Sequence, residues 1–228
     1  MTFNINQFNR SEYIEEEEAG AYQDALMELF LASPEGQARA EADPDLGFWA
    51  YQFMYYGHQY IGASLPTMKV VEADEIVTEL FPRKISTRSP DDADDTIPEL
   101  VAFWQFLKRE FKLSNAAAIL DFLDEVQPAF KGLMNNPANF GMAKSFFMKG
   151  QAAGFDMTDS KQMDTFMHLH NAAMLAGEKT SPPLPFDEGL DLFDEPSRGS
   201  DTKKDKQKKK ARRKLARASR KKNRKRQK

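Results

Sequence analysis

Apolar residues recur at intervals of three and four along most of the first 175 positions, the spacing of one face of an α-helix. The clearest stripes run through Leu100–Phe111, Ile119–Phe130 and Met163–Met174. No long run alternates between apolar and polar residues as a half-buried strand does. The pattern therefore predicts an all-α protein, a compact bundle of about seven or eight helices joined by short connections.

Serine followed by an acidic or proline-containing turn marks three expected helix starts. Ser11 precedes a strongly acidic first turn, and Ser33 and Ser89 are each followed directly by proline. A serine hydroxyl accepts a hydrogen bond from the first free N–H groups of a helix, and proline suits the first helical position. Helices are predicted to begin at all three serines.

Two further helices are expected in the middle of the chain. Residues from about Asp45 to Ala63 are apolar on two sides of a helix, which is typical of a buried element. A shorter helix is predicted from about Ala73 to Phe81, ending at Pro82, because proline disrupts a helix interior. A short strand near Lys69–Val71 remains an alternative.

Composition divides the chain into three parts. Residues 1–177 carry the helical pattern and are predicted to form one all-α domain. Residues 178–202 are rich in proline, glycine and acidic residues and are predicted to form a disordered linker. Residues 203–228 form a basic tail, predicted to be disordered or to become helical on a partner.

Charge is segregated between these parts. The tail holds 17 basic residues and one acidic residue, a formal charge of +16, while residues 1–202 hold 15 basic and 34 acidic residues, a formal charge of −19. The chain as a whole is near −3. Such asymmetry is typical of a protein that contacts nucleic acid or another anionic surface.

The tail is predicted to bind the phosphate backbone of RNA or DNA. In a helical conformation it would place four arginines between Arg213 and Arg224 on one face, where guanidinium groups suit phosphate. It has no aromatic residue on which a base would stack. The predicted nucleic-acid-binding residues are Lys208, Lys209, Lys210, Arg212, Arg213, Lys214, Arg217, Arg220, Lys221, Lys222, Arg224, Lys225 and Arg226.

Other uses of the tail stay open on the sequence alone. A basic tail also serves solubility, or it folds back onto an acidic body. Anionic lipid and acidic protein are further candidate partners. In a nucleated cell the same run is typical of a nuclear-localisation signal.

One short stretch of the linker resembles a known docking peptide. Leu190, Asp191, Leu192 and Phe193 are similar to the last four positions of the pentapeptide by which bacterial replication and repair proteins bind the sliding clamp. That pattern begins with glutamine, where this chain has Gly189. The resemblance implies a protein-binding role for Leu190, Leu192 and Phe193; the alternative is a local anchor that docks the linker on the protein's own body.

The chemistry-bearing residues do not form a catalytic or metal-binding motif. The chain has no cysteine, and His168 and His170 lie two residues apart, on different sides of a helix. The acidic runs Glu15–Glu18 and Asp91–Asp95 fall at predicted helix starts, where carboxylates complement the helix dipole. We expect no enzymatic activity, no cofactor and no metal.

Two apolar stretches need a choice between packing and binding. The aromatic stretch Phe48–Tyr60 contains no Lys or Arg, so core packing is favoured over base stacking. Several methionines between Met142 and Met174 suit either an irregular core or an adaptable partner groove, and core filling is the commoner use. The uncharged stretch Leu46–Met68 carries polar residues at its centre, which argues against a membrane span.

The sequence thus predicts a non-enzymatic, cytoplasmic protein that associates with nucleic acid through its basic tail. The absence of cysteine fits a reducing compartment, and the N-terminal stretch lacks the pattern of a secretory signal. The alternative is a protein-interaction adaptor, in which the helical bundle or Leu190–Phe193 binds a protein and the tail serves solubility or targeting.

Overall fold

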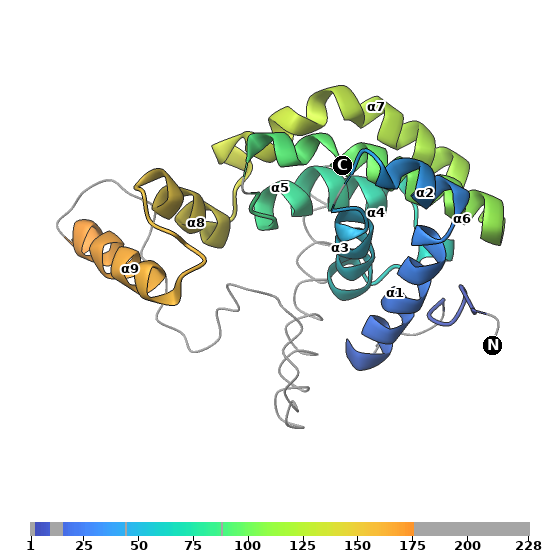
Figure 1. Ribbon diagram of the computed structural model, residues 1–228, viewed down its shortest axis with the longest axis horizontal. Helices are drawn as coiled ribbons and strands as arrows, with labels where there is room; N and C mark the ends of the chain where they lie inside the picture. The colour runs from blue at the N-terminus through green and yellow to red at the C-terminus, as the bar shows by residue number, and fades with distance from the viewer. Residues whose placement is uncertain (1–2, 10–15, 44, 88, 176–228) are drawn as a thin grey trace, which may run out of the picture. The chain divides into compact units, whose positions relative to one another are not determined.

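The computed structural model describes residues 3–9, 16–43, 45–87 and 89–175, and all regular structure within them is helical (Figure 1). The all-α prediction is confirmed. When α3 and its π-helical continuation, and α4, η3 and α5, are each counted as one rod, the described residues hold eight helices beside short 3-10 turns. The α-helices are α1 (Glu16–Leu31), α2 (Pro34–Ala40), α3 (Phe48–Tyr56), α4 (Val70–Asp74), α5 (Phe81–Lys84), α6 (Thr96–Phe111), α7 (Ala116–Asn135), α8 (Met142–Ala152) and α9 (Ser160–Leu175).

Serine caps account for two of the predicted starts. The Ser33 hydroxyl accepts a hydrogen bond from the Gly36 N–H at 3.1 Å, and α2 begins at the next residue. The Ser89 hydroxyl accepts from the Asp91 N–H at 3.2 Å, but the element that it caps is a short 3-10 helix, η4 (Pro90–Asp94). The third serine, Ser11, lies outside the described residues.

The prediction that a helix ends at Pro82 is wrong. Helix α4 runs without interruption into η3 (Glu75–Leu80), a π-helical segment, and then into α5, which contains this proline. In the π segment the Phe81 N–H donates to the carbonyl of Ile76, five residues back. In a regular α-helix the ring of Pro82 would clash with the carbonyl four residues back; the wider π turn directly before it is where the chain adjusts.

The short strand considered near Lys69–Val71 is also wrong. Lys69 precedes α4, and Val70 and Val71 form its first turn. The Glu72 carboxylate accepts a hydrogen bond from the Lys69 N–H at 2.8 Å, satisfying one of the donors that a helix start leaves free. This local bond favours helix at a pair of β-branched residues.

One large hydrophobic core joins α1, α3, the α4–α5 rod, α6 and α7. Helix α6 supplies much of it, because Leu100, Phe103, Trp104 and Leu107 have no exposed surface. The stripe predicted from Ile119 to Phe130 faces this core from α7. The helix predicted over residues 45–63 is α3 with its continuation η1 (Gly57–Ile61), and it buries residues on both of the expected sides.

Helices α8 and α9 form a second, much smaller core. Its buried members are Phe146, Met157 and Phe166, and Figure 1 shows α8 and α9 side by side. A Cβ on Gly150 would lie 2.1 Å from the Met157 sulfur, so a larger residue there would force this methionine to move. The pair is called the α8–α9 hairpin below.

Candidate functional site

The predicted nucleic-acid-binding residues, from Lys208 to Arg226, lie outside the described residues. The same holds for Leu190, Leu192 and Phe193. Both sites therefore remain predictions. What the structure describes is the helical part that precedes them.

That helical part is strongly acidic over most of its length. The described residues from 3 to 140 include 22 acidic and 8 basic side chains, whereas the α8–α9 hairpin, residues 141–175, has three of each. A surface with this excess of carboxylates repels a polyanion. The net charge of the described residues 3–140 is therefore unfavourable for contact with nucleic acid.

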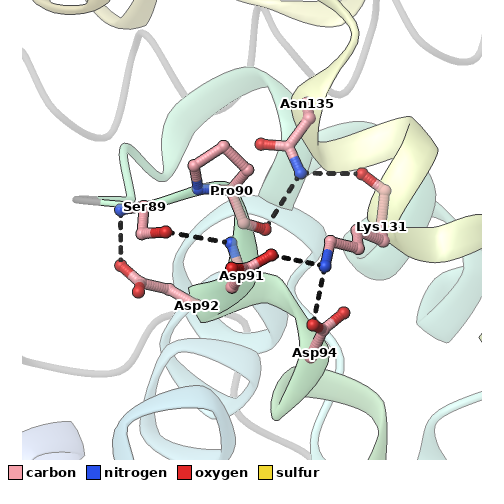
Figure 2. Close-up of polar contacts among 7 residues, drawn as sticks. All are labelled: Ser89, Pro90, Asp91, Asp92, Asp94, Lys131 and Asn135. Carbon is pink, nitrogen blue, oxygen red and sulfur yellow. Dashed lines mark hydrogen bonds and ion pairs between the residues drawn. The ribbon is translucent and has the colours of Figure 1, made fainter.

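The acidic run Asp91–Asp95 is held by cations from two other helices. Figure 2 shows the Lys131 ammonium of α7 between two carboxylates, donating to Asp91 at 2.6 Å and to Asp94 at 2.7 Å. The next acid, Asp95, pairs with the Arg39 guanidinium of α2. The hydrogen bonds to Asp91 and Asp94 raise the pKa of Lys131. Asp91, Asp92 and Asp94 are exposed as predicted, whereas Asp95 is partly buried, and the run also ties η4 to α7.

Asn135 completes this contact from one turn further along α7. Its side-chain amide donates to the Pro90 carbonyl at 3.1 Å and to the Lys131 carbonyl at 3.0 Å (Figure 2). The Asp92 carboxylate is used within η4, where it accepts from the Ser89 N–H at 3.0 Å. The polar contacts of this region thus hold η4 against α7, which is a structural role.

Glu99 of α6 is a fully buried acid placed at the start of α3. One carboxylate oxygen accepts a hydrogen bond from the Ala50 N–H at 2.6 Å. The residue before α3, Gly47, has φ of 107° and no side chain with which to cap the helix, so Glu99 caps it from a neighbouring helix. Burial raises the pKa of Glu99 to about 7, so this carboxyl changes charge near neutral pH.

A second buried acid, Asp43, contributes through its charge to the raised pKa of Glu99. Asp43 is 3% exposed, and burial, followed by the charge of Asp95, raises its pKa. The Nε of Arg39 lies 3.7 Å from one Asp43 oxygen. Burial and the neighbouring carboxylate thus oppose ionisation of Asp43, while the Arg39 guanidinium favours it.

The histidines do not form a metal site. His170 of α9 is buried beside Phe146, confirming it as a histidine of the apolar stripe, whereas His168 is exposed. His58 is buried in the larger core between Phe8 and Tyr22. Among the described residues, no three His, Asp or Glu side chains are grouped closely enough to hold a metal ion.

Lys144 is a buried cation at the joint between α7 and α8. Its ammonium donates to the Met134 carbonyl, in the last turn of α7, at 2.9 Å and lies 4.2 Å from the centre of the Phe140 ring. Burial lowers the pKa of Lys144 to about 8. A cation at a helix C-terminus is favoured by the helix dipole, so Lys144 caps α7 from the following helix.

The packing interpretation is confirmed for most of the aromatic stretch and for three of the methionines, whereas Met142 is more than half exposed. Trp49, Phe53 and Tyr56 of the aromatic stretch are buried in the larger core. Met157 is buried in the smaller core, and Met163 and Met167 pack against it. No helix in the described part of the chain is long and apolar enough to cross a membrane.

Sequence reasoning missed Glu99 and Lys144. Each is a charged residue at helical spacing from an apolar one, Glu99 four positions before Phe103 and Lys144 three before Phe147. A single charge at such a spacing is a usable signal of a buried cap, although its partner is invisible without the fold.

Comparison with known proteins does not extend this picture. No protein-family profile, curated protein or solved structure matches the chain.

Proposed function

We propose that this chain is a non-enzymatic, nucleic-acid-associated protein that binds the phosphate backbone of RNA or DNA through residues 203–228. The contact is electrostatic and has little sequence preference, because the tail carries no aromatic residue for stacking on bases. The helical bundle does not contact the nucleic acid. It recruits or presents another molecule at the place where the tail is bound.

Charge segregation is the observation that supports this proposal. The described residues hold 25 acidic and 11 basic side chains, while the tail holds 17 basic residues and one acidic residue. Three of these 11 basic residues, Arg39, Arg109 and Lys131, are paired with carboxylates. A polyanion is therefore attracted by the tail and repelled by the bundle.

Neutralising charge at two places separates tail binding from general attraction. One full-length variant replaces Arg213, Arg217, Arg220 and Arg224 with glutamine; the matched control replaces four exposed cations of the described bundle with glutamine. The control positions are Lys69, Arg83, Lys108 and Lys112.

Binding to a short duplex is measured for both variants over a range of salt concentrations. The tail variant is expected to bind more weakly and with a shallower salt dependence, by about 0.9 in the logarithmic slope for each phosphate that the tail no longer neutralises. The bundle control keeps the slope of the unchanged chain. Equal losses of affinity in the two variants would show that the tail has no special role.

The adaptor function is the second candidate, and one feature of the α8–α9 hairpin favours it. Leu169 and Met142 are more than half exposed, and Leu175 is 91% exposed. Large apolar side chains left exposed beside so small a core are candidates for contact with another protein. A Leu169→Ser, Leu175→Ser double variant that retains every captured protein partner of the unchanged chain would remove this support.

A further inference from the structure

The N-terminal segment, Phe3–Asn9, lies on an aromatic surface of the bundle. The Phe3 ring is 5.0 Å from Tyr22 and 5.8 Å from Phe111, measured between ring centres. The Phe8 ring is 5.0 Å from Tyr22 and 5.7 Å from His58. Tyr22 of α1, His58 of η1 and Phe111 of α6 are called the aromatic platform below.

The segment is shaped by its own turns. The Gln7 N–H donates to the Asn4 carbonyl and the Asn9 N–H to the Asn6 carbonyl, both at 3.2 Å. The Asn4 side chain accepts from the Asn6 N–H at 3.1 Å, and the Asn9 amide donates to the Asn6 side chain. Asparagine favours such turns because its side chain bonds the nearby backbone.

These turns sort the segment into two faces. Ile5 and Phe8 are buried and Phe3 is partly buried, whereas Asn4, Asn6 and Gln7 are exposed. The pattern is that of a compact peptide with three apolar anchors, Phe-x-Ile-x-x-Phe, on a surface that matches them.

Two polar contacts join the segment to the bundle in the described residues. The Tyr22 hydroxyl donates to the Ile5 carbonyl at 3.1 Å, and the Ser64 hydroxyl donates to the Asn9 side-chain oxygen at 2.7 Å. The first contact is made to the main chain and so does not depend on the side chain that the peptide presents at that position. Both are contacts that another peptide can reproduce.

The N-terminal segment does not satisfy the hydrogen-bonding groups of His58, which it covers. This side chain is 9% exposed, and neither ring nitrogen has a hydrogen-bond partner among the described residues. A buried imidazole offers one donor and one acceptor, and leaving both unpaired is unfavourable. The apolar Phe8 ring, which meets His58 at a steep edge-on angle, cannot satisfy either nitrogen.

We propose that the aromatic platform is a peptide-binding site, occupied in the free protein by the chain's own N-terminal segment. The partner is a segment of another protein with two aromatic anchors spaced like Phe3 and Phe8. It also carries a hydrogen-bonding group that pairs with His58. Binding displaces the N-terminal segment, so that the segment acts as a competing internal ligand.

This site is independent of the basic tail. The platform lies in the acidic bundle, and its occupant is held by apolar anchors and a main-chain carbonyl. Failure of the tail to bind nucleic acid would leave the peptide site untouched, and loss of the peptide site would leave the tail untouched.

Weakening the internal ligand in the full-length chain tests the proposal. The probe is a fluorescein-labelled synthetic peptide of residues 1–9, followed by fluorescence anisotropy. The Phe8→Ala chain is expected to bind this probe at least about tenfold more tightly than the unchanged chain, because the internal segment no longer occupies the site. Gln7→Ala, on the exposed face of the same segment, is the matched control and is expected to bind like the unchanged chain.

Equal binding of the probe by the Phe8→Ala and unchanged chains overturns the proposal. So does loss of the folded bundle in the Phe8→Ala chain, monitored by circular dichroism and tryptophan fluorescence, because the segment would then be an inseparable part of the core.

A second set of probes tests the role of His58. Peptides with Tyr, Trp or His in place of Phe8 are titrated into the Phe8→Ala chain and into the same chain carrying His58→Leu as well. At least one polar ring is expected to bind more tightly than Phe and to lose that advantage when His58 is replaced. A Phe peptide that binds best in both chains excludes His58 from recognition.

Discussion

The bundle of α1–α7 and the α8–α9 hairpin differ in how they are held together. The first has a large core rich in aromatic side chains, including Phe53, Phe103 and Trp104 with no exposed surface. The second has three buried apolar residues, Phe146, Met157 and Phe166. Since stability from burial grows with the apolar area removed from water, the two regions should differ in their resistance to unfolding.

The two regions also differ in net charge, and the region with the larger core is the more acidic. The bundle tolerates a large excess of carboxylates over cations, because its core offsets their mutual repulsion. The hairpin, with equal numbers of acidic and basic residues, has little repulsion to offset. Among the described residues, the excess of acidic side chains thus lies in the part with the larger core.

The largest expected effect comes from deleting a ring in each core. Phe103→Ala is expected to lower the free energy of unfolding of the bundle by about 3–5 kcal/mol. Both tryptophans, Trp49 and Trp104, are buried in the bundle, so their fluorescence during denaturant unfolding reports on the bundle alone. The midpoint of that transition should fall sharply.

The matched change in the hairpin is Phe166→Ala. It is expected to leave the tryptophan transition almost unchanged while helical circular dichroism is lost at a lower denaturant concentration, because local unfolding of the hairpin does not require the bundle to open. A tryptophan transition that falls as far as in Phe103→Ala would mean that the two regions unfold as one.

A smaller effect is expected from the buried acid of the bundle. The pKa of Glu99 is raised by burial to about 7 in the folded chain, from 4.5. The folded state therefore binds the proton more tightly, and stability is lost as the pH rises from about 4.5 to 7, by roughly 3 kcal/mol in total. Glu99→Gln, which cannot ionise, should remove this part of the pH dependence.

The check compares free energies of unfolding at pH 5 and pH 8 in the unchanged chain, in Glu99→Gln and in Glu79→Gln. Glu79 is an exposed acid of η3 and serves as the control, which should follow the unchanged chain. If Glu99→Gln shows the same pH dependence as the control, ionisation of Glu99 does not contribute to it.

The smallest effect is expected from removing one helix cap in each region. Ser33→Ala deletes the hydroxyl that caps α2, and a loss of about 1 kcal/mol should appear in the tryptophan transition. Asp159 caps α9 by accepting hydrogen bonds from the N–H groups of Lys161 and Gln162 at 2.8 and 3.1 Å. Asp159→Ala should instead speed amide hydrogen exchange in α9 and leave the tryptophans unaffected.

Periodicity was enough to predict α6, α7 and α9. The stripes in α6, α7 and α9 face the cores as expected, because the spacing of apolar residues directly encodes which side of a helix is buried. The caps at Ser33 and Ser89 were also predictable, since the groups that bond lie within three residues of each other.

The rest depended on contacts between distant residues. Pro82 is accommodated by a π turn that no local rule anticipates, and Glu99 caps a helix that begins about fifty residues earlier. The contact between the Phe8 and His58 rings likewise joins residues far apart in the sequence. The predicted sites in the linker and tail lie outside the described residues and stay predictions.

The contrast in charge between bundle and tail leads to the most direct test of the proposed function. A chain ending at residue 200 and the full chain are titrated with the same RNA and DNA duplexes at 50 and 200 mM salt. If the tail engages about seven phosphates, the affinity of the full chain should fall roughly 10³- to 10⁴-fold between these salt concentrations, and the shorter chain should not bind. Equal binding by the two chains would contradict the proposal that the tail is the nucleic-acid-binding element.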